Sequence, residues 1–193
     1  QDVVDTINRG MIHIVEPELD ASVKTAVKSG YLTANIKPTE SNIFMIAVPT
    51  PFHKNSNNEV TNSPIPNIDH VKDSIIKIAP YIRPGNLILL ESTSPVGTTE
   101  LIADLLKRED IEIDNIFIAY SPERVLPGNI MRELVENDRV VGGINKISTL
   151  KAAEFYRTFV EGKVLETSAK TAEMVKLTEN SFRDVNIAFA NEL

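Results

Sequence analysis

Three short apolar runs, each followed at once by a polar loop that contains proline, constrain the fold of this chain most. The runs are residues 43–48, 87–90 and 116–120, and the loops after them are residues 49–51, 91–97 and 121–128. Continuous apolar runs of this length are typical of strands that are buried on both faces of a parallel sheet. Ligands of open α/β sheets bind beyond the carboxyl ends of the strands. We therefore expect the three loops to converge on one edge of a sheet and to form the functional site there.

Strand and helix patterns alternate along most of the chain. Two further strands are expected at 139–143 and 164–166, and helices at 19–29, 68–82, 130–136 and 150–160, with another that Thr98 or Thr99 would N-cap. A short first helix ends near Gly10. This alternation predicts an α/β fold with right-handed crossovers, in which a Rossmann-like, doubly wound and mostly parallel sheet forms the core.

From about Ser168 onward the pattern changes to one long helix. On a helical wheel, Lys176, Asn180 and Arg183 fall on one face. The opposite face carries an apolar stripe of Met174, Phe182, Val185 and Phe189. The polar cluster is either a solvated helix face, or a site at which an ammonium and an amide stabilise an oxyanion while the arginine binds a phosphate or carboxylate.

Composition argues against several classes of function. The net charge is −7 and no run of Lys or Arg is present, so we expect no nucleic-acid partner. No stretch is apolar for long enough to span a membrane, and no signal-peptide pattern opens the chain. Cysteine is absent and the three histidines are scattered, so no metal site is expected.

The loops after the strands offer candidate ligand groups. Thr50 and Thr93 each follow a strand, where a hydroxyl either bonds a ligand or caps a turn, and residues 49–51 alone read as a turn. Gly97 precedes a helix N-terminus, which favours an anion such as pyrophosphate. Glu123 is either a general base or water-orienting carboxylate, or the partner of Arg124 or Arg139.

Four motifs occur together in one order along the chain: VPTP at 48–51, STSPVGTT at 92–99, SPER at 121–124 and TAEMVKLTEN at 171–180. In order and spacing they resemble the motifs of the UDP-glucose/GDP-mannose dehydrogenase family, and the resemblance covers essentially the whole chain. Residues 125–128 and 180–193 are most similar to the branch of the family that acts on UDP-N-acetyl-D-mannosamine.

The resemblance implies an NAD-dependent enzyme. Members of that branch oxidise the C6 alcohol of the sugar to a carboxylate with two NAD molecules, through an aldehyde that a thiol captures and a thioester that is hydrolysed, and their product feeds bacterial surface polysaccharides. It also implies a cytoplasmic homodimer built on the long helix. Two alternatives stay open, namely a 6-dehydrogenase of another UDP-sugar (UDP-N-acetylglucosamine or UDP-glucose) and a non-catalytic nucleotide-binding or dimerisation module.

The same resemblance assigns roles to residues in the loops. Thr50 and Thr93 match threonines that contact NAD. Glu123 matches a carboxylate that acts as general base or activates water. Arg124 and Val125 match positions in the loop that surrounds the sugar.

On the long helix, Lys176 matches the lysine that stabilises the oxyanion and moves protons, and Asn180 and Arg183 match its substrate-side partners. The family's Gly-rich first turn, the acidic residue that binds the adenine ribose, its catalytic cysteine and its third domain are not in the sequence, and Pro127 stands where UDP-glucose dehydrogenases carry a glutamate. We therefore expect residues 1–167 to be the remainder of an NAD-binding domain and residues 168–193 the beginning of a central helical dimerisation domain. Such a fragment would be inactive alone.

Overall fold

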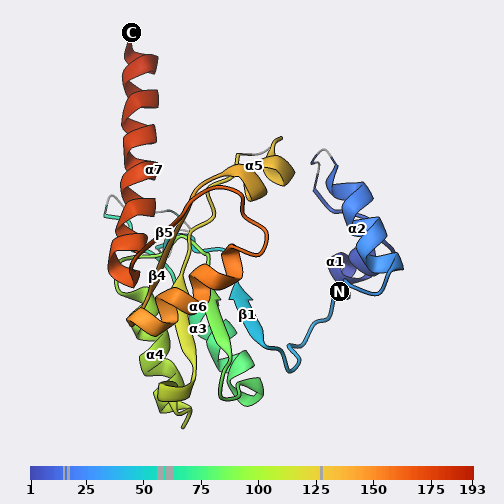
Figure 1. Ribbon diagram of the computed structural model, residues 1–193. Helices are drawn as coiled ribbons and strands as arrows, with labels where there is room; N and C mark the ends of the chain where they lie inside the picture. The colour runs from blue at the N-terminus through green and yellow to red at the C-terminus, as the bar shows by residue number, and fades with distance from the viewer. Residues whose placement is uncertain (15, 17, 56–58, 60–62, 127) are drawn as a thin grey trace.

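The computed structural model describes residues 1–14, 16, 18–55, 59, 63–126 and 128–193. Its centre is a five-stranded sheet with the strand order β1-β2-β3-β4-β5 (Figure 1). The strands are β1 (Ile43–Ile46), β2 (Leu87–Leu90), β3 (Phe117–Tyr120), β4 (Arg139–Gly143) and β5 (Val164–Ser168). All five expected strands are present, and the predicted α/β fold with a mostly parallel sheet is confirmed.

One strand runs against the prediction. β1, β2 and β3 are parallel, but β4 pairs antiparallel to β3, with Ala119 opposite Gly143. The expected right-handed crossover is therefore wrong at this step. In the described part of the connection the one helix is α5 (Ile130–Glu136). Its seven residues span about 10 Å, and it lies beyond the carboxyl edge of β3 (Figure 1). Because the chain does not return to the opposite edge, β4 starts where β3 ends.

Helices cover both faces of the sheet, as the doubly wound prediction requires. α3 (Asp69–Ile78) and α4 (Thr98–Arg108) pack on one face, and α6 (Lys146–Tyr156) packs on the other. Strand β2 shows why its sequence is apolar throughout: Ile88 and Leu90 face the first layer, whereas Leu87 and Leu89 face the second. All four side chains are at most 5% exposed, so each contributes about 1.5–3 kcal/mol of burial energy.

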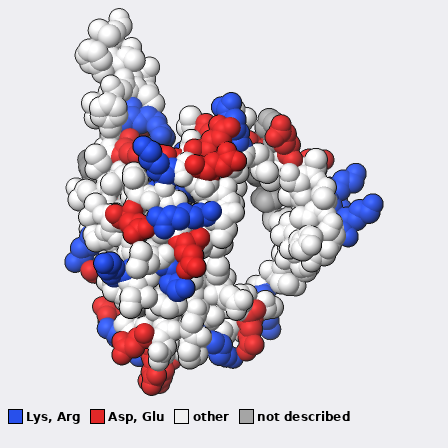
Figure 2. Space-filling model, viewed as in Figure 1, with Lys and Arg blue, Asp and Glu red and all other residues white. Residues whose placement is uncertain are grey.

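Helices α1 (Asp2–Asn8) and α2 (Leu19–Lys28) form a pair beside this body. Both begin and end close to their predicted bounds, and Gly10 and Gly30 follow them with positive φ, as expected for helix ends. Neither helix has a buried residue. An opening separates the pair from the sheet (Figures 1 and 2).

The long helix predicted from Ser168 is α7 (Ala169–Glu192). Ser168 is its N-cap and accepts a hydrogen bond from the Thr171 N–H group. The first turns pack against β3, β4 and β5, whereas the distal part stands away from the body as a column of mostly uncharged residues (Figures 1 and 2). Among the described residues, no helix is both long and apolar enough to cross a membrane.

Two helix starts differ from the prediction. Gly97, with φ of 98°, is the N-cap of α4, so Thr98 and Thr99 lie inside the helix and neither caps it. Helix α6 begins at Lys146 rather than Leu150, because the Asn145 side chain accepts a hydrogen bond from Ser148 and caps the helix there.

Candidate active site

The loops after β1 and β2 are hydrogen-bonded to each other at the carboxyl edge of the sheet. The Thr50 hydroxyl donates to the Thr93 carbonyl at 2.6 Å. The Ser92 hydroxyl accepts from the Val48 N–H group and donates to the Val48 carbonyl, each at 2.8 Å. The two threonines expected at the cofactor therefore lie on loops that are held together. The Thr50 oxygen keeps acceptor capacity for a ligand, because a hydroxyl has two lone pairs.

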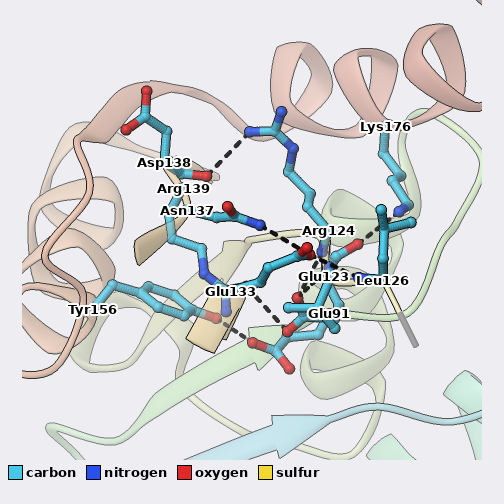
Figure 3. Close-up of polar contacts among 11 residues, drawn as sticks. Glu91, Glu123, Arg124, Leu126, Glu133, Asn137, Asp138, Arg139, Tyr156 and Lys176 are labelled. Atoms are coloured by element: carbon cyan, nitrogen blue, oxygen red, sulfur yellow. Dashed lines mark hydrogen bonds and ion pairs between the residues drawn. The ribbon is translucent and has the colours of Figure 1, made fainter. Parts of the chain in front are cut away.

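Glu123, in the loop after β3, is held by its neighbours. One carboxylate oxygen accepts from the Arg124 and Val125 N–H groups at 2.6 and 3.0 Å. The other oxygen lies 3.1 Å from the Arg139 guanidinium, whose side chain is only 2% exposed (Figure 3). Of the two arginines considered as partners, Arg139 makes the ion pair with the Glu123 carboxylate.

Arg124 pairs instead with α7. Its guanidinium donates to both carboxylate oxygens of Glu179, at 2.6 and 3.1 Å, and to the Asp138 carbonyl at 3.1 Å. Forked contacts of this kind are stronger and more directional than those of a single donor. They fix the loop after β3 against the long helix.

Lys176 lies one helical turn before Glu179 and reaches the same loop. Its ammonium donates to the Glu123 carbonyl at 2.6 Å (Figure 3). Burial lowers the pKa of Lys176 below its usual value. The carboxylates of Glu179 and Glu123 counteract this effect, whereas the charges of Arg183 and Arg124 lower the pKa further. The ammonium is therefore easier to deprotonate than that of a lysine in water.

A hollow of about 570 Å³ opens beside this lysine. It is lined by Arg124, Lys176, Glu179, Phe182, Arg183, Asn186, Ile187 and Ala190. Lys176 and Arg183 share the hollow, as the helical wheel predicts. Phe182 lines it too, so its expected place on the opposite face is wrong. Asn180 is half-buried on the same helix but is not among the lining residues.

Other carboxylates hold the loop between β3 and α5. Glu16 is 6% exposed and accepts from the Gly128 and Ile130 N–H groups at 2.9 and 2.8 Å. Glu133 accepts from the Leu126 N–H group at 2.8 Å. Pro127, which the sequence marks as a departure from UDP-glucose dehydrogenases, lies outside the described residues.

Tyr156 and Glu91 form a second polar group, next to Arg139. The Tyr156 hydroxyl donates to Glu91 at 2.7 Å, and its ring faces the Arg139 guanidinium 5.5 Å away (Figure 3). Burial raises the pKa of Glu91, although the Tyr156 bond opposes the effect. Glu91 was not predicted as a site residue. It follows an apolar strand, and a position after such a strand is also what marks Thr50 as a candidate.

Glu173 corrects the expectation of a pyrophosphate site at the start of α4. Its carboxylate, fully buried on α7, accepts from the Gly97 and Thr99 N–H groups at 2.6 and 2.8 Å. The helix N-terminus therefore already binds an anion, which the protein itself supplies. The pyrophosphate expectation for this helix is wrong.

Comparison with known proteins identifies the family. Residues 1–160 match the UDP-glucose/GDP-mannose dehydrogenase family, NAD binding domain, and residues 170–193 match the central domain of the same family. The chain belongs to the UDP-glucose/GDP-mannose dehydrogenase family. The family and the NAD cofactor expected from the motifs are thereby confirmed.

Named relatives lie within this dehydrogenase family. The chain is 52% identical to the UDP-N-acetyl-D-mannosamine dehydrogenase of Campylobacter jejuni, covering 100% of this chain and 48% of the relative. It is 50% identical to the NDP-N-acetyl-D-galactosaminuronic acid dehydrogenase of Ralstonia nicotianae, and the match covers 100% of this chain and 46% of that relative. The structure of UDP-D-ManNAc dehydrogenase from Pyrococcus horikoshii superposes with a TM-score of 0.89 at 40% identity. The match covers 100% of this chain and 45% of that structure. The chain thus spans about half the length of these relatives.

Proposed function

We propose that this chain is the cofactor-binding half of an NAD-dependent enzyme that oxidises the C6 alcohol of UDP-N-acetyl-D-mannosamine to the carboxylate, in two oxidations, for bacterial surface polysaccharide. The names of the Campylobacter and Pyrococcus relatives support this substrate. The name of the Ralstonia relative, which is 50% identical to the chain, supports another N-acetylhexosamine as the alternative sugar. The proposed division lies between residues 167 and 168, where the NAD-binding part gives way to the central helix.

The placement of Lys176 supports the chemistry most strongly. Its half-buried ammonium meets the loop after β3 at the Glu123 carbonyl, beside a hollow at the carboxyl edge of the sheet. An ammonium in such a place stabilises the negative charge that develops on a sugar oxygen as hydride leaves C6. Its lowered pKa lets it give up and regain a proton during the reaction.

The cofactor would lie against Thr50 and Thr93. Both are at the carboxyl ends of adjacent parallel strands, and the hydrogen bond between their loops fixes the pair while leaving acceptor capacity on the Thr50 oxygen. These residues therefore fit NAD, which would accept hydride from the sugar carbon. The filled N-terminus of α4 takes no part in its binding.

Glu123 is suited to orient the water that hydrolyses the acyl intermediate. A carboxylate has about four lone-pair sites, and the bonds from Arg124, Val125 and Arg139 occupy three of them. Its side chain is 35% exposed, so the remaining site can accept a bond from water. The thiol that forms the intermediate would come from outside this chain, which has no cysteine.

On the sugar-nucleotide side, Arg183 provides a cation on the wall of the hollow and Asn180 an amide near it. We assign Arg183 to the diphosphate, because a guanidinium pairs well with phosphate oxygens. Arg124 is already bound to Glu179, so we assign it and Val125 to shaping the sugar loop.

The proposed assembly is a homodimer through α7. Its apolar stripe is exposed, with Val185 at 67% and Phe189 at 64%, and an exposed stripe of this kind marks an interaction surface. This stripe also favours the alternative of a dimerisation module without activity. We place the enzyme in the cytoplasm, because the proposed reaction draws on its NAD pool.

The test is NADH formation by the intact enzyme, given UDP-N-acetyl-D-mannosamine, UDP-N-acetylglucosamine, UDP-N-acetylgalactosamine and UDP-glucose in parallel. We expect about two NADH per sugar with the mannosamine compound only, one for each hydride transferred. Turnover of another sugar would retain the chemistry and change the substrate. If none of the sugars yields NADH, the enzyme proposal is wrong and the dimerisation module takes its place.

A further inference from the structure

Glu173 is a buried acid with no part in the chemistry proposed above. Its side chain is 0% exposed. One oxygen accepts from the Thr99 N–H group at 2.8 Å and from the Thr99 hydroxyl at 2.6 Å, and the other accepts from the Gly97 N–H group at 2.6 Å. A buried carboxylate needs such a full set of partners, since burial without them costs several kcal/mol.

The bonds of Glu173 link α7 to the start of α4. The N-cap of α4 is Gly97, which has no side chain to satisfy the first N–H groups of the helix. Glu173 satisfies two of them from 74 and 76 residues away in sequence. The contact therefore fixes the axial position and the rotation of α7 relative to α4.

Lys176 lies three residues after Glu173, on nearly the same side of α7 and one turn further along. While Glu173 holds the loop before α4, Lys176 donates to the Glu123 carbonyl in the loop after β3. A displacement by one residue would move Lys176 by about 1.5 Å along the helix and about 100° around it. The lysine would then leave the Glu123 carbonyl.

The loop that Glu173 holds is also the one that carries Thr93. Residues 92–99 run from the Thr50–Thr93 hydrogen bond to the first turn of α4 without leaving the carboxyl edge. The Glu173 carboxylate thus connects the loop of the proposed cofactor site to the helix that carries Lys176.

We propose that Glu173 is a positioning residue, which couples the cofactor loop 92–99 to Lys176 by fixing the first two turns of α7. The importance of this coupling for turnover rests on the proposed function. The coupling itself is a property of the fold and can be tested without substrate.

Glu173→Gln is the most direct test, made in the intact enzyme. An amide has one oxygen, so its NH₂ group must face either the Gly97 N–H group or the Thr99 donors, which places donor against donor. We expect α7 to shift and Lys176 to become more exposed. Asn145→Ala is the control, because it removes the cap of α6, costs about 1 kcal/mol and touches neither loop.

Two readouts are needed. The first is the pH dependence of acylation of Lys176, followed by mass spectrometry without substrate or NAD, whose midpoint should rise in Glu173→Gln towards that of an exposed lysine and stay at the wild-type value in Asn145→Ala. The second is turnover at neutral pH, which should fall by about a hundredfold in Glu173→Gln alone, the loss typical of a displacement of about 1 Å.

A folded Glu173→Gln protein with a wild-type acylation midpoint would overturn the proposal, whatever its turnover. If this variant does not fold, Thr99→Val replaces it, because it removes one of the three bonds at little change in volume. Thr99→Val should move the acylation midpoint and the turnover in the same directions by smaller amounts. Wild-type values for both would also overturn the proposal. If the wild type forms no NADH, the proposed function fails, while acylation still decides the coupling.

Discussion

The ion pair between Glu123 and Arg139 leads to an asymmetric prediction about stability. Replacing the glutamate, Glu123→Gln, should cost much more free energy of unfolding than replacing the arginine, Arg139→Met. The reason is exposure: the Arg139 side chain is 2% exposed, whereas that of Glu123 is 35% exposed. Removing either residue leaves the other charge unpaired, and only the Arg139 charge is cut off from water.

The magnitudes follow from the contacts. In Arg139→Met the enzyme loses one charge-assisted bond, about 1.5–3 kcal/mol, and one cation–π contact, about 0.5–2 kcal/mol. It also loses a buried guanidinium whose Nε and Nη2 have no hydrogen-bond partner among the described residues, which offsets much of that cost. Glu123 keeps two N–H partners and contact with water. We expect a net cost of about 1 kcal/mol.

In Glu123→Gln the buried guanidinium loses its ion-pair partner, and the amide must place its NH₂ group against the Arg139 donor or against the two N–H groups. Breaking a buried pair from this side costs about 3–5 kcal/mol. The double variant should be more stable than Glu123→Gln alone, by about 1–3 kcal/mol.

The assay is urea unfolding of the wild type, both single variants and the double variant, compared at a common m-value. Equal costs for the single variants, or a double variant at the sum of the two, would refute the reasoning. Either result would mean that Arg139 is hydrated or otherwise compensated when Glu123 is removed.

Three further predictions concern the intact enzyme. Lys176→Met should lower kcat by about a hundredfold or more, because oxyanion stabilisation is lost. Lys151 is exposed, so Lys151→Met should leave kcat unchanged. Unaltered turnover in Lys176→Met would favour the non-catalytic module. Glu16→Gln should raise KM for the UDP-sugar and not for NAD, because its carboxylate holds the N–H groups of Gly128 and Ile130, which follow β3. An equal rise in both constants in steady-state assays would contradict this. Burial raises the pKa of Glu91, so its ionisation opposes folding. The contribution of Glu91 to the free energy of unfolding should fall as pH rises from the ordinary carboxyl range through the raised pKa, and Glu91→Gln should remove this contribution when wild-type and variant melting curves are compared across that range.

Local sequence was sufficient to predict the framework of the site. The strands at 87–90 and 139–143 were predicted with correct bounds, because an apolar run of this length between turn residues is compatible with few structures other than a strand. The short helix at 130–136 was also correct. The direction of β4 was not predictable in the same way, since it depends on where the chain travels between strands rather than on any residue within the strand.

The partners of the site residues could not be predicted, because they come from distant parts of the chain. Glu173 meets Gly97 across 76 residues, and Arg124 meets Glu179 across 55. Patterns of period 2 or 3.6 indicate which face of an element is polar, but they carry no information on which charge it meets. The wheel therefore placed Lys176 and Arg183 on one face and gave no role to Glu173 or Glu179.

The distribution of charge around the hollow bears on its ligand. The chain as a whole carries a net charge of −7, yet Arg124, Lys176 and Arg183 line this hollow, and Glu179 gives the one carboxylate among the described residues that line it. Glu179 forms an ion pair with Arg124, whereas Lys176 and Arg183 form none among the described residues. Two cations beside an apolar wall, to which Phe182 and Ile187 contribute, fit a ligand with two negative charges and a partly apolar body. A nucleoside diphosphate sugar meets this requirement, whereas a neutral sugar would offer no negative charge to either cation.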